Sequence, residues 1–231
     1  MRALWRYLFI LVITVLLWNQ AILRPVKILS IFFHKTGHAL AAFFSGFGTD
    51  SFRAVFGGMG DTIINAKGWL PSLIITSGGY IGSVLFFVII MYLKKTKAKK
   101  YVLGCLSIIY LLITISNPGL RQAVVYSVIF ASIIIVLFMI HREGIEELVI
   151  DVIGISAIAY IIFDTFVATI LLKINQQFSI IREWNLRIPE DIVRMSNATG
   201  IPQVLWAVIW LILSVLVLNL VIFKGSNLKK R

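Results

Sequence analysis

The sequence predicts an all-α membrane protein with six or seven transmembrane helices. Of its 231 residues, 59% are hydrophobic, and the mean hydropathy is +0.95. Several mostly apolar runs reach the roughly 18 to 20 residues that a helix needs to cross a bilayer. Lysines and arginines lie at the ends of these runs, so the flanks of membrane helices explain the net charge of +12. Nucleic acid is therefore not expected as a partner.

The apolar runs are expected to form a single membrane domain over residues 1–231. The first run follows Arg2 and Arg6 and lacks a small-x-small cleavage site, so we interpret it as an uncleaved span. The fourth run is short, and the Asn-Pro-Gly turn at 117–119 could lead tightly into the fifth. In chain order, the expected spans are 4–23, 28–46, 69–93, 101–116, 120–140, 148–172 and 203–223.

The basic segments predict how the chain is oriented in the cell membrane. Cytoplasmic segments of membrane proteins carry an excess of lysine and arginine. Residues 94–100 are rich in lysine, and the C-terminal segment 224–231 is also basic. Seven spans would place both segments on the same side, so both are expected in the cytoplasm. An interfacial first helix or a re-entrant loop would change the topology of residues 1–70, which the sequence leaves open.

The second expected span contains the segment His-Lys-Thr-Gly-His at 34–38. Two histidines four residues apart lie on one helix face, about 40° apart around the helix axis. This is the spacing with which the H-E-x-x-H motif binds zinc, and the glutamate of that motif is the general base. Lys35 stands at the glutamate position here. The segment therefore predicts a metal site and argues against the hydrolytic chemistry that normally accompanies it.

Three further stretches between or within the spans have distinctive compositions. Residues 47–68 are rich in glycine and predict a short loop or a β-hairpin after the histidine-bearing helix. Residues 173–202 form the longest polar stretch and are expected outside the bilayer, partly as a surface helix. Gly78, Gly79 and Gly82 lie within the third span, where small residues allow helices to pack closely. A substrate groove beside the histidines is the alternative.

Two aspartates lie within the sixth span. Asp164 is near its centre, whereas Asp151 is closer to the expected cytoplasmic end. An ionised side chain in a membrane span requires a partner. Asp164 could ligate a metal together with His34 and His38, an arrangement that leaves a fourth position open for water. It could instead form a metal-free ion pair with Lys35. The sequence alone leaves both interpretations open.

The segment 33–40, Phe-His-Lys-Thr-Gly-His-Ala-Leu, resembles the H-E-x-G-H-A core of the site-2-protease-like membrane zinc metallopeptidases. The likeness is to the compact bacterial branch of this family and extends over roughly residues 28–210. Its other parts are the glycine-rich segments 57–60 and 77–83, the Phe-Asp-Thr segment 163–165, and the C-terminal segments 189–191 and 198–202 with Trp206.

The resemblance implies a site-2-protease-like fold and assigns functional residues. It implies zinc as the cofactor, with His34 and His38 as ligands and Asp164 as the third. Asp191 is the second choice for that third ligand. A substrate groove is implied along four glycines, which are Gly57, Gly58, Gly78 and Gly79.

Lys35 departs from the family pattern, which has glutamate at this position, and more than one functional hypothesis follows from this difference. The main expectation is a zinc metallopeptidase homologue with impaired proteolysis that binds or regulates membrane-protein or peptide segments in the bilayer. One alternative is an active membrane protease with an unusual base. A second alternative is a small carrier or channel gated by a pair between Lys35 and Asp164. The sequence makes no prediction of oligomeric state.

Overall fold

The computed structural model describes residues 2–57, 68–116, 121–140, 142–181 and 184–227. Most of these residues are helical and none of them forms a β-strand, which confirms the predicted all-α class. The α-helices are α1 (Arg2–Leu16), α2 (Arg24–Ala42), α3 (Asp50–Phe56), α5 (Trp69–Leu93), α6 (Lys99–Ile115), α7 (Arg121–Ile140), α8 (Glu143–Ile162), α9 (Leu172–Phe178), α10 (Glu190–Thr199) and α11 (Gln203–Asn227). A wider π-helical segment, η4 (Phe163–Leu171), joins α8 to α9.

Four helices of the described residues are long and apolar enough to cross a membrane, fewer than the six or seven expected. They are Trp69–Leu93, Ala123–Ile140, Glu143–Phe178 and Gln203–Ile222. The N-terminal helices Leu4–Leu16 and Ala21–Phe47 pass this test only as a pair, which is bent by 118°. The helix α6 has 17 residues, just below the length that a span requires. The expected first and second spans therefore count at most as one broken span.

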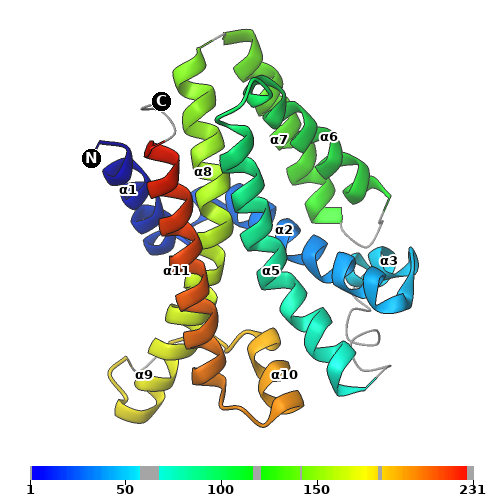
Figure 1. Cartoon of the computed structure of the whole chain (residues 1–231), viewed down its shortest axis with the longest axis vertical. Helices are drawn as coiled ribbons and strands as arrows, with labels where there is room; N and C mark the ends of the chain where they lie inside the picture. Colours follow the sequence, from blue (N-terminus) through cyan, green and yellow to red (C-terminus); the bar gives the residue numbers. More distant parts are fainter. Residues whose placement is uncertain (1, 58–67, 117–120, 141, 182–183, 228–231) are drawn as a thin grey trace.

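The helices α5, α8 and α11 run along the long axis of the molecule, and α2 crosses them (Figure 1). The helices α6 and α7 form an antiparallel hairpin to one side. Both termini and the turn between α5 and α6 lie at one end of the bundle, whereas α9 and α10 lie at the other.

The crossing of α2 and α5 depends on glycines. A Cβ atom on Gly37 would lie 2.2 Å from the carbonyl oxygen of Gly78, and one on Gly82 would lie 2.5 Å from the Cα of Gly37. The two backbones are thus in direct contact, as in the small-xxx-small packing of membrane helices. This close approach brings α5 against the face of α2 that carries the histidines.

The described part of the expected glycine-rich loop is partly helical. Gly46 (φ 93°) and Gly48 (φ 61°) take left-handed backbone conformations that end the π-turn Phe43–Phe47, and α3 follows directly. The short helix α3 buries Val55 and Phe56, so packing of one apolar face explains why it is not a loop. Residues 47–57 contain no β-strand, so this part of the segment does not form the alternative β-hairpin. Residues 58–67 lie outside the described residues.

The polar stretch 173–202 contains two short helices separated by non-helical chain. The helix α9 ends at Ser179, which adopts a left-handed conformation (φ 51°). The Asn175 side chain then holds the departing chain, because it bonds both the backbone N–H and the carbonyl of Ile181. The helix α10 follows and packs against α5 and α11.

Asp151 joins three helices at the end of the bundle that carries both termini. Its carboxylate is fully buried and forms ion pairs with Arg6 of α1 and with Lys94 at the end of α5. The charges of the two cations repel each other if the carboxylate is removed, and Lys94 is itself largely buried. Removing one partner of a buried ion pair destabilises a protein more than replacing both partners with apolar residues, because the remaining charge stays buried without a counter-charge.

We expect Asp151→Asn to lower the free energy of unfolding by about 3 kcal/mol, because Lys94 loses its buried counter-charge. The matched control is Glu143→Gln on the exposed end of the same helix, where the loss should stay below about 0.5 kcal/mol. Unfolding of the detergent-solubilised protein by added sodium dodecyl sulfate measures both values. Equal stabilities of the two variants would show that the Asp151 cluster does not hold the bundle together.

Candidate metal centre

The two histidines of α2 face each other within the bundle. The Nε2 atoms of His34 and His38 are 3.0 Å apart, and both side chains are buried. The rings of Tyr80 and Tyr160 pack on His34 at centroid distances of 5.1 and 4.7 Å. A Cβ atom on Gly79 would lie 2.4 Å from the Nε2 of His38. A glycine at this position of α5 therefore leaves the room that the imidazoles occupy.

A hydrogen bond from α2 to α5 sets the tautomer of His38. Its Nδ1 lies 2.7 Å from the carbonyl oxygen of Ile75. Because a carbonyl only accepts, Nδ1 carries the proton and donates it. Whenever the ring is neutral, this bond leaves Nε2 unprotonated and able to ligate a metal, and such a bond behind a histidine is typical of metal ligands.

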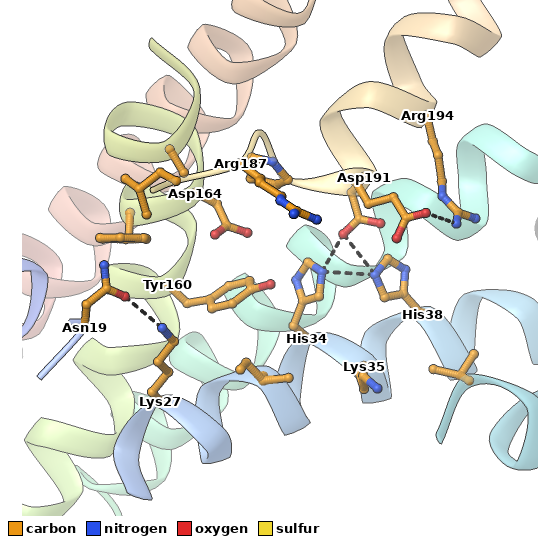
Figure 2. A pocket seen from close by; sticks show the side chains of 17 residues that line it. Asn19, Lys27, His34, Lys35, His38, Tyr160, Asp164, Arg187, Asp191 and Arg194 are labelled. Atoms are coloured by element: carbon orange, nitrogen blue, oxygen red, sulfur yellow. Dashed lines mark hydrogen bonds and ion pairs between the residues drawn. The ribbon is translucent and has the colours of Figure 1, made fainter. Parts of the chain in front are cut away.

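Asp191 of α10 completes a group of three possible metal ligands. Its Oδ2 lies 2.7 Å from the Nε2 of His34 and 3.2 Å from the Nε2 of His38 (Figure 2). Burial opposes ionisation of this carboxyl, but the neighbouring imidazoles of His38 and His34 outweigh it and hold its pKa below the ordinary range. The carboxylate is thus available as an anionic ligand.

The sequence around α10 explains how Asp191 reaches this place. The helix begins after Pro189, and Glu190 and Asp191 occupy its first turn, where acidic side chains are favoured. Ile192 and Met195 are fully buried. Two tryptophans of α11 hold the rest of the helix, since the Trp210 Nε1 donates to the Met195 sulfur and the Trp206 Nε1 to the Thr199 hydroxyl.

The donor set fits zinc. Two imidazole nitrogens and one carboxylate oxygen are the ligands of many catalytic zinc sites, which keep a fourth position open. Bonds of about 2.0 to 2.1 Å in a tetrahedron would separate the ligand atoms by about 3.3 Å. The observed separations of 2.7 to 3.2 Å are slightly shorter, so a small outward movement of the side chains would accommodate the ion.

A cavity of about 450 Å³ opens beside this group. It is bounded by α2, by the junction of α8 and η4, and by the chain that leads into α10 (Figure 2). Seven of its 17 lining residues are charged and six are apolar. The lining residues are Asn19, Lys27, Ile31, His34, Lys35, His38, Val55, Tyr160, Phe163, Asp164, Ala168, Leu186, Arg187, Pro189, Glu190, Asp191 and Arg194.

The two aspartates considered from the sequence occupy different places. Asp191 lies against the histidines, while Asp164 lines the cavity and is not part of the three-residue group. The geometry therefore favours Asp191, the second choice, as the third ligand. Within the described chain no ion pair joins Asp164 to Lys35, so the pair required by the carrier hypothesis is not formed.

The four glycines expected along a groove lie elsewhere or outside the described residues. Gly78 and Gly79 belong to the crossing of α2 and α5, and Gly57 ends α3. None of these three lines the cavity. Gly58 lies among the residues that the structure leaves undescribed.

Sequence reasoning did not find the tyrosines beside His34, the Ile75 carbonyl or Arg187. The tyrosines and Ile75 lie in apolar runs where the residue type carries no signal of function. The Pro-Glu-Asp segment at 189–191 was the available signal for Asp191, and it made Asp191 only the second choice for the third metal ligand.

Comparison with known proteins gives one match. A family model described as Peptidase M50B-like matches residues 7–221, which covers nearly the whole chain and every ligand candidate. No curated protein matches, and no solved structure matches.

The geometry predicts which aspartate supports metal binding. We expect the purified protein to retain about one zinc ion after a weak chelator wash, and Asp191→Asn to weaken zinc binding at least tenfold because a charged ligand is lost. Asp164→Asn is the matched control and should retain the metal. Inductively coupled plasma mass spectrometry of the detergent-solubilised variants measures the zinc content. A parent protein without zinc, or zinc lost from Asp164→Asn alone, would contradict the assignment.

Proposed function

The chain belongs to the Peptidase M50B-like family, as its resemblance to site-2-protease-like membrane metallopeptidases predicts, and from this premise we propose that it is a proteolytically impaired homologue. In this proposal, the protein holds zinc through two histidines and Asp191 and binds membrane-protein segments that it does not cut. Its candidate membrane helices and its family both indicate a multi-pass membrane protein.

The observation that carries this proposal is the place of Lys35. It follows His34 directly in α2 and lines the cavity beside the candidate ligands. A general base must accept a proton from the attacking water, and a glutamate does this in active enzymes of the H-E-x-x-H type. A protonated lysine carries no free electron pair for that proton. The residue at the position of the general base therefore opposes hydrolysis.

Zinc, when bound, would polarise a substrate carbonyl and acidify a water molecule at its open position. The residues of this chain provide the other functions of the site. His38 is oriented by the Ile75 carbonyl, and α10 places Asp191 against both rings. The apolar part of the cavity wall gives room for a side chain of a bound segment. Binding is thus supported by the same residues, while proton removal is not.

One specific observation favours the alternative of an active protease. Asp164 lines the same cavity, and it is the carboxylate of the described lining that neither contacts the histidines nor pairs with Arg194, as Glu190 does. If Asp164 accepts the proton, the protein cleaves peptides in spite of Lys35. Asp164→Asn would then abolish cleavage. In a proteolytically impaired protein, the same substitution would have no effect, because there is no cleavage to lose.

The proposal predicts that restoring the carboxylate restores activity. We expect no detectable hydrolysis of an apolar fluorogenic peptide by the zinc-loaded parent. Lys35→Glu should raise the rate at least about 100-fold above the background, because general-base catalysis typically contributes 10² to 10⁴. Release of the fluorophore in detergent solution measures the rate.

Two controls separate the base from other effects. Lys35→Gln removes the positive charge without supplying a base and should remain inactive. Adding His38→Ala to the Lys35→Glu variant should abolish the gain, because the metal is lost. Cleavage by the parent at the rate of Lys35→Glu would refute the impaired state.

A further inference from the structure

The wall of the cavity carries more cationic than anionic side chains. Its cations are Lys27, Lys35, Arg187 and Arg194, and its carboxylates are Asp164, Glu190 and Asp191. With neutral histidines the lining therefore has a net charge of about +1, and a bound zinc ion would raise this charge to about +3. A cavity with this balance attracts anions rather than neutral peptide bonds.

Two of the cations already have partners. Arg194 bonds the carboxylate of Glu190 one turn earlier in α10. Lys27 donates to the side-chain oxygen of Asn19 at 3.0 Å and lies over the rings of Trp18 and Phe163. These interactions hold Arg194 and Lys27 in place at the edges of the cavity.

Lys35 and Arg187 differ from the other two cations. Neither makes an ion pair or a side-chain hydrogen bond with any part of the chain that the structure describes. Lys35 is half-buried next to the histidines, whereas Arg187 is exposed. In the view of Figure 2, the Arg187 guanidinium projects between the carboxylates of Asp164 and Asp191. Two cations that have no ion-pair or hydrogen-bond partner among the described residues therefore line one cavity beside the candidate metal centre.

The lysine changes what this place can bind. A glutamate at position 35 would repel a carboxylate next to the metal, and so would help a product of hydrolysis to leave. Lysine at the same position raises the local charge by two units and attracts that group. Guanidinium and ammonium groups form charge-assisted hydrogen bonds with carboxylates, which are about twice as strong as neutral ones.

We infer that the cavity binds the free C-terminal carboxylate of a membrane segment, with Lys35 and Arg187 as its cationic contacts. This inference rests on the proposed function and specifies its ligand. A zinc ion held by the two histidines and Asp191 would keep one position open, and a carboxylate oxygen is a suitable ligand for it. Ile31, Phe163 and other apolar lining residues suit an apolar end of a chain, and the volume is within the range of sites for small ligands.

Two fluorescent apolar peptides of the same sequence test this inference, one ending in a carboxylate and the other in an amide. Fluorescence anisotropy with the full-length, zinc-loaded protein in detergent measures both dissociation constants. We expect the acid to bind at least tenfold more tightly than the amide, because only the acid forms the two charge-assisted contacts.

Variants locate the preference in the two cations. Lys35→Met and Arg187→Gln should each reduce the ratio between acid and amide, and the double variant should bring it near one. Lys35→Arg keeps the charge and should preserve the preference. Lys97→Met and Arg142→Gln remove exposed cations outside the cavity and should leave the ratio unchanged.

The outcomes distinguish this inference from the proposed function. Equal binding of acid and amide by the parent, or a preference that survives in the double variant, overturns the inference and leaves segment binding intact. Failure of both peptides to bind overturns the proposed function as well. Displacement of the acid peptide by dihexanoylphosphatidic acid at lower concentration than by unlabelled peptide would identify a lipid phosphate as the ligand instead, and would also overturn the inference.

Discussion

The contact between Asp191 and the two imidazoles of α2 is the interaction on which the rest of the site depends. Asp191 is separated from His38 by 153 residues along the chain, so only the tertiary fold brings them together. The glycines of α2 and α5 let these two helices touch, and the tryptophans of α11 hold α10 over them. A largely buried carboxylate against two imidazoles is stable only if a cation balances it. A proton or a metal ion can supply that charge.

The family and the residues of this chain give different answers about chemistry. The family model and the donor set agree on a metal centre, and a fold of this kind can keep its ligands while its catalytic step is lost. The charge at position 35 distinguishes a protein that hydrolyses a bound segment from one that only binds it. A negative side chain there would serve hydrolysis and release, whereas in our proposal Lys35 serves retention of a bound segment. Asp164 keeps the alternative of proteolysis open to experiment, because it is a carboxylate on the same wall.

Local patterns predicted the parts of the molecule that depend on helix geometry. The spacing of His34 and His38 placed both on one helix face, and apolar runs predicted the helical membrane class. Features that depend on tertiary packing could not be predicted from local sequence patterns. The 118° bend between the N-terminal helices lowers the number of candidate spans. Pro25 lies at the start of α2 and is compatible with a helix beginning there, but it does not predict the angle of the bend. Asp191 lies in a polar stretch, where an aspartate is usually solvated, so the choice of the third ligand required the fold.

The central claim is that this bundle holds zinc between α2 and α10 with a lysine in place of the base. Anomalous X-ray scattering at the zinc edge from crystals of the zinc-loaded protein tests it most directly. We expect a single strong peak within about 2.0 to 2.2 Å of the Nε2 atoms of His34 and His38 and of a carboxylate oxygen of Asp191. A peak bound by Asp164 instead, or the absence of a peak at α2, would contradict it.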